Sequence, residues 1–400
     1  MHVRHDFEFR GEHISFDFNW NIPKQRNDIG NINSMALDIA GGCNLECVYC
    51  SERTILPQRR PMSLKIIYKA LNCFIKWAKK NSNVFIHLAN GEPLLYADNV
   101  RKLGIKAREL TKKSNQKLNL FLTTNGTLLN EKICNWIICE GWNIRISIDG
   151  PASIHNKYRG EGTYELIEKY LCYLAKKIPN RLWTTSVLCH GANFSKIFKH
   201  LANLKVKNID FSPVISKPHS KLTLNNTDLI NYRNFLQNYV YQIYKSKSQP
   251  VFNQFKNRIL KVIGFGNTPF SCSAGRKLVA VDSNGDLFPC FRFLGLKKYK
   301  IGALNNGFDP ESVHNFQLNV AKPVIKIPKC RKCWAAPFCG GPCYAQMELF
   351  NINANIPPSD YCGLIKSECE AAIWFVEKLR QKDPEKLIKY LNGNINSLFD

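Results

Sequence analysis

Short apolar runs alternate with longer segments of helical periodicity along the first 245 residues. Helices of this length between consecutive strands predict parallel strands joined by crossover helices. The six β/α units counted from Ser34 to about Lys245 are fewer than the eight of a closed barrel, so we expect an α/β fold with a partial, TIM-like (β/α)6 barrel. The predicted strands are 34–39, 84–89, 118–123, 143–148, 182–188 and 208–211, and the predicted helices are 99–113, 131–140, 163–177, 194–204 and 228–244.

The pattern changes at both ends of this region. FEFRGEHISFDF alternates apolar residues around Gly11, which predicts a hairpin that caps the bottom of the barrel. GFGNTP at 264–269 breaks the helical pattern, and a small, irregular, cysteine-rich domain follows it. Helical periodicity returns over 369–391. The expected segments are a hairpin (1–33), the barrel (34–245), a linker (246–269), the cysteine-rich domain (270–365) and a helical tail (366–400).

Composition narrows the class of protein. With 400 residues, 44% of them hydrophobic, the chain can bury a core without disulfide staples. It has no run of about 18 uncharged apolar residues, and its start lacks the apolar core of a signal peptide, so we expect a cytoplasmic protein with no membrane span. A formal net charge of +25 predicts either an acidic partner or only a bias in composition. In a reducing compartment, the 16 cysteines are expected to bind metal or do chemistry.

The strongest chemical signal follows the first predicted strand. Cys43, Cys47 and Cys50 lie on one loop after two glycines, Gly41 and Gly42. Three thiolates can hold three irons of a four-iron cluster and leave the fourth iron open to a chelating substrate. The alternative is a zinc knuckle, which needs a fourth ligand close by.

Further motifs sit at the ends of the next three predicted strands, where parallel α/β folds place their sites. They are Asn-Gly-Glu-Pro at 90–93, Thr-Thr-Asn-Gly at 123–126 and Ser-Ile-Asp-Gly-Pro at 147–151. Together with the cysteine loop, they resemble the radical S-adenosylmethionine (SAM) superfamily, although Asn90 stands where the family has glycine. The resemblance implies a SAM site formed by Tyr49, Asn90, Gly91, Glu92, Pro93, Asn125, Ser147, Asp149 and Arg159.

A second cysteine set has the spacing C-x12-G-x4-C, then C-x2-C-x5-C-x3-C, then a lone cysteine. It resembles the SPASM domain of peptide- and protein-modifying radical SAM enzymes. The resemblance implies two auxiliary four-iron clusters, with one auxiliary iron lacking an assigned ligand and Cys369 as the nearest spare. A pair of zinc ribbons is the alternative. Cys330, Cys333, Cys339 and Cys362 would hold one auxiliary cluster, and Cys272, Cys290 and Cys343 the other.

The two resemblances cover about residues 34–365 and imply a radical SAM oxidoreductase. Three 4Fe-4S clusters and SAM would be its cofactors, and flavodoxin or ferredoxin its reductant. SAM cleavage would give a 5′-deoxyadenosyl radical that removes hydrogen from a substrate carbon, and no catalytic acid or base is assigned. The remaining thiols fall on helical or strand patterns and are expected to be buried and inert; they are Cys73, Cys134, Cys139, Cys172 and Cys189.

Two kinds of substrate fit this resemblance. Anaerobic sulfatase-maturing enzymes form formylglycine, and there an Asp proposed as base follows the cysteine that corresponds to Cys290. Phe291 follows it here, which favours maturation of ribosomally made peptides by thioether or carbon-carbon crosslinks. With 42 residues before Cys43, we expect an acidic precursor peptide to be recognised by a separate leader-binding protein or by the hairpin.

The alternative from another class is a zinc-ribbon nucleic-acid-binding protein that uses the basic charge. The sequence shows no separate RNA-binding module and no series of aromatic residues interleaved with basic ones. Nucleic acid is therefore the less favoured partner.

Overall fold

The computed structural model describes residues 2–21, 31–217, 220–350 and 356–388. Contacts divide the chain into two compact units. We call residues 25–185 and 273–322 the strand-rich unit, and residues 1–24, 186–272 and 323–400 the hairpin unit. These units do not follow the predicted domains, because each combines parts of the barrel region with parts of the cysteine-rich region.

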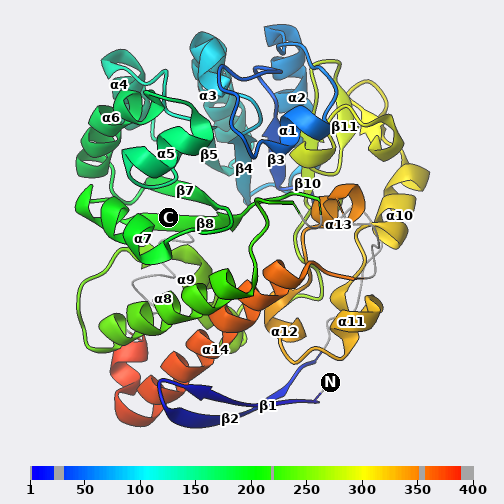
Figure 1. The fold of residues 1–400 in the computed structure, drawn as a ribbon. Helices are drawn as coiled ribbons and strands as arrows, with labels where there is room; N and C mark the ends of the chain where they lie inside the picture. Colours follow the sequence, from blue (N-terminus) through cyan, green and yellow to red (C-terminus); the bar gives the residue numbers. More distant parts are fainter. Residues whose placement is uncertain (1, 22–30, 218–219, 351–355, 389–400) are drawn as a thin grey trace. The chain divides into compact units, whose positions relative to one another are not determined.

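The strand-rich unit is built on parallel strands separated along the chain by helices (Figure 1). Neighbouring strands of the series β3 to β7 pair in parallel register, in chain order. The α/β fold class and the partial-barrel core are thereby confirmed. The strands are β3 (Ser34–Leu37), β4 (Asn83–Leu88), β5 (Lys117–Thr124), β6 (Asn143–Ser147) and β7 (Leu182–Leu188), whose last residues belong to the other unit; the helices are α1 (Ser51–Ile55), α2 (Leu64–Trp77), α3 (Ala97–Lys113), α4 (Glu131–Cys139), α5 (Ala152–Arg159) and α6 (Thr163–Lys177).

Residues from the predicted cysteine-rich domain extend this sheet. β10 (Leu278–Val281) pairs in parallel with β3. β11 (Asp286–Phe288), β12 (Gly302–Ala303) and β13 (Gly307–Phe308) then continue it in antiparallel pairs. The sequence predicts an irregular segment here because these strands have only two to four residues, too few to show a period.

The hairpin unit contains the antiparallel pair β1 (His2–Phe9) and β2 (Glu12–Asn19). The parallel strands β8 (Asn208–Pro213) and β9 (Val251–Phe252) belong to the same unit. Its helices are α7 (Phe194–Asn203), α8 (Asn226–Tyr244), α9 (Asn253–Val262), α11 (Pro328–Arg331), α12 (Ala336–Cys339), α13 (Tyr344–Phe350) and α14 (Ser359–Lys382).

Two expectations differ from the structure in this unit. Residues 246–269, expected to be a linker, include β9 and α9, and α9 buries Phe255 and Ile259 completely. The C-terminal helix begins at Ser359, ten residues before the predicted start, and therefore carries Cys362. The last predicted helical residues, 389–391, lie outside the described residues.

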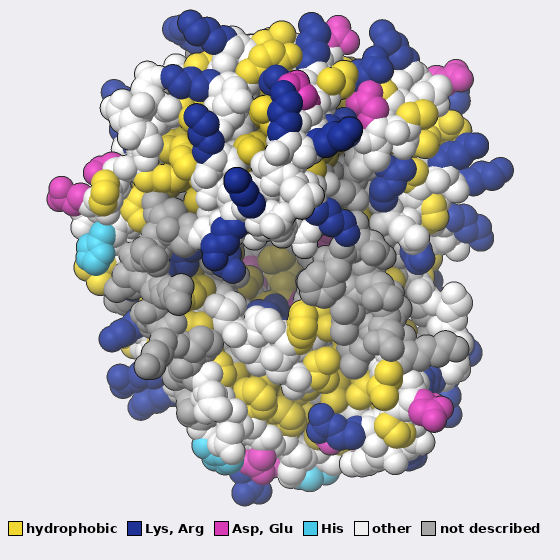
Figure 2. Space-filling model, turned by 180° about the vertical axis from the view of Figure 1, so that it is seen from behind, with side chains coloured by type: hydrophobic (Ala, Val, Ile, Leu, Met, Phe, Trp, Pro, Cys, Tyr) yellow, Lys and Arg dark blue, Asp and Glu magenta, His cyan; other side chains and the backbone are white. Residues whose placement is uncertain are grey.

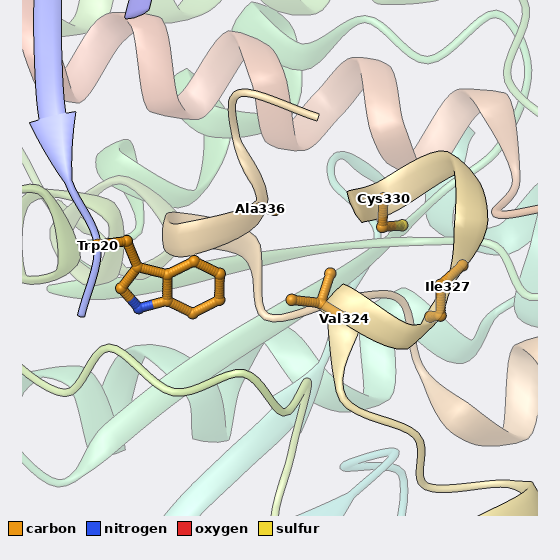
Figure 3. Close-up of a cluster of buried hydrophobic side chains, with 5 residues drawn as sticks. All are labelled: Trp20, Val324, Ile327, Cys330 and Ala336. Carbon is orange, nitrogen blue, oxygen red and sulfur yellow. The ribbon is translucent and has the colours of Figure 1, made fainter. Parts of the chain in front are cut away.

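The hairpin packs on the cysteine-rich segment and on α14. The sequence prediction was that it caps the bottom of the barrel. Trp20 forms a buried cluster with Val324, Ile327, Cys330 and Ala336 (Figure 3). The ring of Phe9 lies 5.2 Å from that of Trp374 on α14. Burial of these aromatic side chains holds the hairpin within its unit.

Basic side chains are spread over the one face that Figure 2 draws, without one dense patch. In the described part of the chain, none of the helices combines the length and apolar composition needed to cross a bilayer.

Candidate active site

The three-cysteine loop follows β3 and is fixed by backbone contacts on both sides. The backbone N–H of Val48 donates to the carbonyl of Tyr158 at 2.8 Å, and that of Glu92 donates to the carbonyl of Gly42 at 2.8 Å. Gly41 has φ 66°, and a Cβ there would lie 2.5 Å from the backbone of Arg60. Glycine is therefore required at this point of the turn.

The thiols of this loop lie near the surface. Cys43 is exposed, and Cys47 and Cys50 are half-buried. The pKa of Cys47 is raised to about 11. Burial is the main cause, Arg159 opposes it, and the neighbouring thiols of Cys50 and Cys43 contribute to the increase. A metal or cluster is what converts such thiols to thiolates at neutral pH. The thiols of Cys43 and Cys50 are thus close enough to Cys47 to affect its pKa.

Asn125 contacts the same loop from the end of β5. Its Nδ2 lies 3.6 Å from the Sγ of Cys43 and donates to the Oδ1 of Asn44 at 2.8 Å. A hydrogen bond to a ligand sulfur is one way in which a protein tunes a cluster. The structure therefore brings Asn125 and the cysteine loop together, in keeping with the sequence.

Glu92 is buried and its carboxylate is fully engaged. It accepts hydrogen bonds from Thr124 Oγ1 at 2.7 Å, from the N–H of Asn125 at 2.6 Å and from the N–H of Leu94 at 3.0 Å. Burial raises the pKa of Glu92, and these three donors oppose that effect. The side chain joins the ends of β4 and β5, so Glu92 positions the two loops.

Asn90 and Gly91 form a left-handed turn against the cysteine loop. Their φ angles are 80° and 52°. A Cβ at Gly91 would lie 1.9 Å from the carbonyl oxygen of Gly42, so only glycine fits. Asn90 tolerates the left-handed conformation, and its Nδ2 donates to the carbonyl of Phe291 at 2.8 Å. The departure from the family's glycine therefore adds a contact.

The half-buried Tyr49 forms a triad with the buried residues Asp149 and Arg159. The Tyr49 hydroxyl donates to Asp149 Oδ2 at 2.5 Å, and Arg159 donates to both oxygens of Asp149 at 2.8 and 3.2 Å. Asp149 and Arg159 are 0% and 7% exposed. The structure brings together three residues that the resemblance assigns to the SAM site, and Asp149 links the Tyr49 hydroxyl to the Arg159 guanidinium. Ser147, at the end of β6, is half-buried.

A second polar network was missed by the sequence analysis. Asp38, at the end of β3, accepts from the N–H of Gly41 at 3.0 Å and pairs with Arg59. Arg59 also donates to Glu52 at 3.2 Å, and Glu52 accepts from the N–H of Gly91 at 3.1 Å. The available signal was an acidic residue in an otherwise apolar strand end, which is costly to bury without a partner.

The hairpin unit contains a cavity lined by four cysteines. Its empty volume is about 340 Å³ including its open mouth. Burial and the Cys362, Cys339 and Cys333 thiols raise the pKa of Cys330 to about 12. Burial raises the pKa of Cys362 to about 11, with Cys339 and Cys333 adding to it. These are the four residues that the resemblance assigned to one auxiliary cluster, and the fold brings them together in one cavity.

The thiols do not converge on a point. Among the residues with a described placement, no three Cys, His, Asp or Glu side chains form a site for a single metal ion. A 4Fe-4S cluster is bound through different irons by each cysteine, so its ligands surround a cavity instead of meeting at one ion. The four cysteines around the cavity fit that donor set better than they fit one zinc ion.

Buried charges lie behind this cavity. Arg258 on α9 donates to the carbonyl of Phe338 at 2.6 Å and to Glu368 on α14 at 2.9 Å. The Tyr232 hydroxyl also donates to Glu368 at 2.9 Å. The carbonyl of Cys339 accepts from Lys261 at 3.4 Å. Sequence periodicity alone gave no sign of this network, because its members lie on four separate helices.

The other assigned cysteines are divided between the units. Cys290 lies in the strand-rich unit, and Cys272 and Cys343 lie in the hairpin unit. Cys369 is completely buried on α14, and its thiol interacts with Cys339 of the four-cysteine cavity. Of the thiols expected to be buried and inert, Cys134 and Cys189 are buried, Cys73 is half-buried, and Cys139 and Cys172 are exposed; the expectation is wrong for the last two because they lie on the outer sides of helices.

Residues 37–204 match the family model of the radical SAM superfamily. The chain has a radical SAM domain. This domain contains the cysteine loop, the Asn90–Gly91 turn and the Tyr49 triad described above. The chain is accordingly an enzyme that uses SAM, and SAM and a 4Fe-4S cluster are the cofactors that this domain implies.

Similarity to known proteins extends beyond the radical SAM domain and covers most of the chain. A cysteine-type anaerobic sulfatase-maturating enzyme of Clostridium novyi is 25% identical over 84% of this chain and 93% of its own. The structure of native anSMEcpe with bound AdoMet and the Kp18Cys peptide matches with a TM-score of 0.72, at 20% identity, over 87% of this chain and 99% of that one. Streptococcus suis SuiB bound to precursor peptide SuiA matches with a TM-score of 0.59, at 15% identity, over 82% and 75%. The fold is therefore shared with both kinds of enzyme.

Proposed function

We propose that this enzyme modifies a ribosomally made precursor peptide at a side-chain or backbone carbon. The product is a thioether or carbon-carbon crosslink or a related change. One support is the four-cysteine cavity, whose cysteine spacing resembles that of peptide-modifying radical SAM enzymes. The other is the likeness to the structure of SuiB bound to its precursor peptide.

The residues divide into three ligand sets. Cys43, Cys47 and Cys50 hold the SAM-binding cluster, and the four-cysteine cavity holds an auxiliary cluster. Cys272, Cys290 and Cys343 hold a second auxiliary cluster with one iron lacking an assigned ligand. Bound together, the first cluster and SAM supply a 5′-deoxyadenosyl radical, which removes a hydrogen atom from the substrate. Tyr49 would contact the adenine of bound SAM, and Glu92 would fix the loop that binds the methionine end.

The observation that carries the proposal is at Phe291. Phe291, the residue after Cys290, has a phenyl ring instead of a carboxylate. Its backbone carbonyl accepts a hydrogen bond from the Nδ2 of Asn90. A phenyl ring cannot accept the proton that formylglycine formation requires from its base.

The partners follow from charge and chemistry. An acidic precursor peptide fits the net charge of +25, and a separate leader-binding protein would present it. Flavodoxin or ferredoxin would supply electrons in a reducing cytoplasm. Membrane and nucleic acid are not proposed partners.

Formylglycine formation is the second candidate function. It is favoured by the 99% coverage of anSMEcpe and by the sulfatase-maturating relatives. Under this proposal, a carboxylate other than one at position 291 would act as base.

The first experiment tests the cofactors. Protein reconstituted without oxygen is compared with the Cys43→Ala, Cys47→Ala, Cys50→Ala triple variant for iron, sulfide and 5′-deoxyadenosine made from SAM and dithionite. We expect about twelve irons in the wild type and about eight in the variant, with SAM cleavage lost only in the variant. Bound zinc without SAM cleavage would refute the proposal and favour a nucleic-acid-binding protein.

The second experiment separates the two reactions. Precursor peptides encoded beside this gene are incubated with the enzyme, SAM and dithionite. A crosslink removes two hydrogen atoms and leaves no aldehyde, whereas formylglycine reacts with a hydrazide probe. Hydrazide labelling of the product would establish the second candidate function.

A further inference from the structure

The parallel sheet of the strand-rich unit has two different faces. A Cβ at Gly126 would lie 3.2 Å from Ile146 on β6 and 3.1 Å from Ile167 on α6, so Ile146 faces the helices. Side chains alternate along a strand, and Arg145 and Ser147 therefore face the opposite way. The face away from the helices is the one on which SAM is proposed to bind.

Aromatic rings line this second face. The rings of His87 and Phe121 lie 5.0 Å apart and are stacked, and the ring of Trp183 lies 6.2 Å from Phe121. Phe85 adds a fourth ring, 6.4 Å from Phe121. We call these four residues the aromatic floor. Each is half-buried, so ring surface remains available to a ligand.

Arg145 stands beside this floor and is exposed. Its strand neighbours in register are Thr123 on β5 and Trp183 on β7. The positive charge of Arg145 also affects His87. Burial, followed by this charge, lowers the pKa of His87 to about 4. His87 is therefore neutral at pH 7, and Arg145 supplies the positive charge next to the rings.

Position along the strand connects Arg145 to the reaction. Arg145 precedes Ser147 by two residues on the same face, which is about 7 Å of extended strand. Ser147 is assigned to SAM under the proposed function. Under the proposed function, Arg145 therefore lies on the same face of β6 as a residue assigned to SAM.

We propose that Arg145 and the aromatic floor form a subsite for an Asp or Glu side chain next to the modified residue of the substrate peptide. Arg145 pairs with the carboxylate in a bidentate manner, and the rings pack against the neighbouring aliphatic or aromatic side chain. This inference rests on the proposed function and adds the class of sequence that the active site selects.

The test uses two fluorescein-labelled dodecapeptides with one central cysteine. They are identical except that the two residues flanking the cysteine are Glu in one and Gln in the other. Binding to the reconstituted enzyme with SAM is measured by anisotropy without oxygen. We expect the wild type to bind the Glu peptide about tenfold more tightly. Equal binding of the two peptides by the wild type would overturn the proposal.

Variants locate the preference. Arg145→Gln is expected to abolish it, Arg145→Lys to retain part of it, and Arg145→Glu to favour a matching peptide with Lys in place of Glu. Lys117→Gln is the matched control, because Lys117 is exposed at the other end of the same face of β5 and should not affect the preference. A preference that survives in Arg145→Gln, or that Lys117→Gln removes equally, contradicts the assignment to Arg145.

Failure of the subsite and failure of the proposed function give different results. Wild-type enzyme that cleaves SAM but does not distinguish the peptides lacks only the subsite. Wild-type protein without iron and without SAM cleavage contradicts the proposed function and, with it, the subsite.

Discussion

The Nδ2 of Asn90 donates a 2.8 Å hydrogen bond to the carbonyl oxygen of Phe291, a residue 201 positions later in the chain. The bond links the loop after β4 to the turn that follows Cys290. Asn90 can make it because its backbone is in the left-handed region, with φ 80°. A loop proposed to meet SAM is thus held against a segment proposed to hold an auxiliary cluster.

Asn90→Ala should lower the free energy of unfolding by about 2 kcal/mol, since it loses the hydrogen bond and strains a left-handed backbone. Asn90→Gly loses only the hydrogen bond and should cost about half as much. Anaerobic urea unfolding measures both. Equal losses in the two variants would mean that backbone conformation does not contribute at this position.

Gly91→Ala should disrupt the SAM-binding cluster site, because its Cβ would overlap the carbonyl oxygen of Gly42. The expected iron content is about eight per chain instead of about twelve. Gly141→Ala is the matched control, with φ 70° and no atom within 4 Å of its Cβ. It should keep the wild-type iron content. Full iron content in Gly91→Ala would show that the two loops can separate without loss of the site.

Arg258→Met leaves the buried carboxylate of Glu368 without its cation and should destabilise the protein by about 4 kcal/mol. The double variant Arg258→Met, Glu368→Gln removes both charges and should lose about 2 kcal/mol. Arg380→Met, which breaks the exposed pair between Arg380 and Glu377, should change stability by less than about 1 kcal/mol. A double variant no more stable than Arg258→Met would argue against the buried charge as the cause.

Cys362→Ala and Cys369→Ala should differ in iron content although both residues lie on α14. Loss of a cavity-lining thiol should remove about four irons. Loss of the Cys369 thiol should leave the iron in place and lower stability by about 1 kcal/mol through a small cavity. Iron and sulfide assays on both variants decide the point, and a four-iron loss in Cys369→Ala would make it a ligand.

His155 makes stability fall at acidic pH. Burial, followed by the charge of Arg159, lowers its pKa from 6.5 to about 4, and its Nδ1 accepts from the N–H of Asp149 at 3.3 Å. Between pH 6.5 and about 4 the unfolded chain takes up a proton that the native chain does not, so stability decreases as pH falls. The total loss through this window is about 3 kcal/mol, and there is none from this group above it.

His155→Asn keeps an acceptor for the N–H of Asp149 but does not titrate. Urea midpoints measured from pH 7 to pH 4 should decline less in this variant than in the wild type. The control is His314→Asn on α10 (Pro310–Asn319), since His314 is exposed and should leave the wild-type slope unchanged. An unchanged slope in His155→Asn would assign the acid sensitivity to other groups.

Local sequence was sufficient for several features. The alternation of strands and helices predicted the parallel core, because side-chain periodicity is a property of a few consecutive residues. The spacing of three cysteines predicted the first loop, because it depends on a short stretch of chain and on the chemistry of the thiol. The four-cysteine set was implied by the resemblance of its spacing to a known domain. The very short strands β11 to β13 carried no such signal.

Tertiary structure decided what the polar residues do. Asp149 and Arg159 are paired with each other, and Glu92 accepts from Thr124, from the N–H of Asn125 and from the N–H of Leu94. The sequence determined where chemistry-bearing residues stand along the chain. The fold alone determined their partners, because a buried charge must find its counterpart, and that counterpart lies from 10 residues away, for Asp149 and Arg159, to 110 residues away, for Arg258 and Glu368.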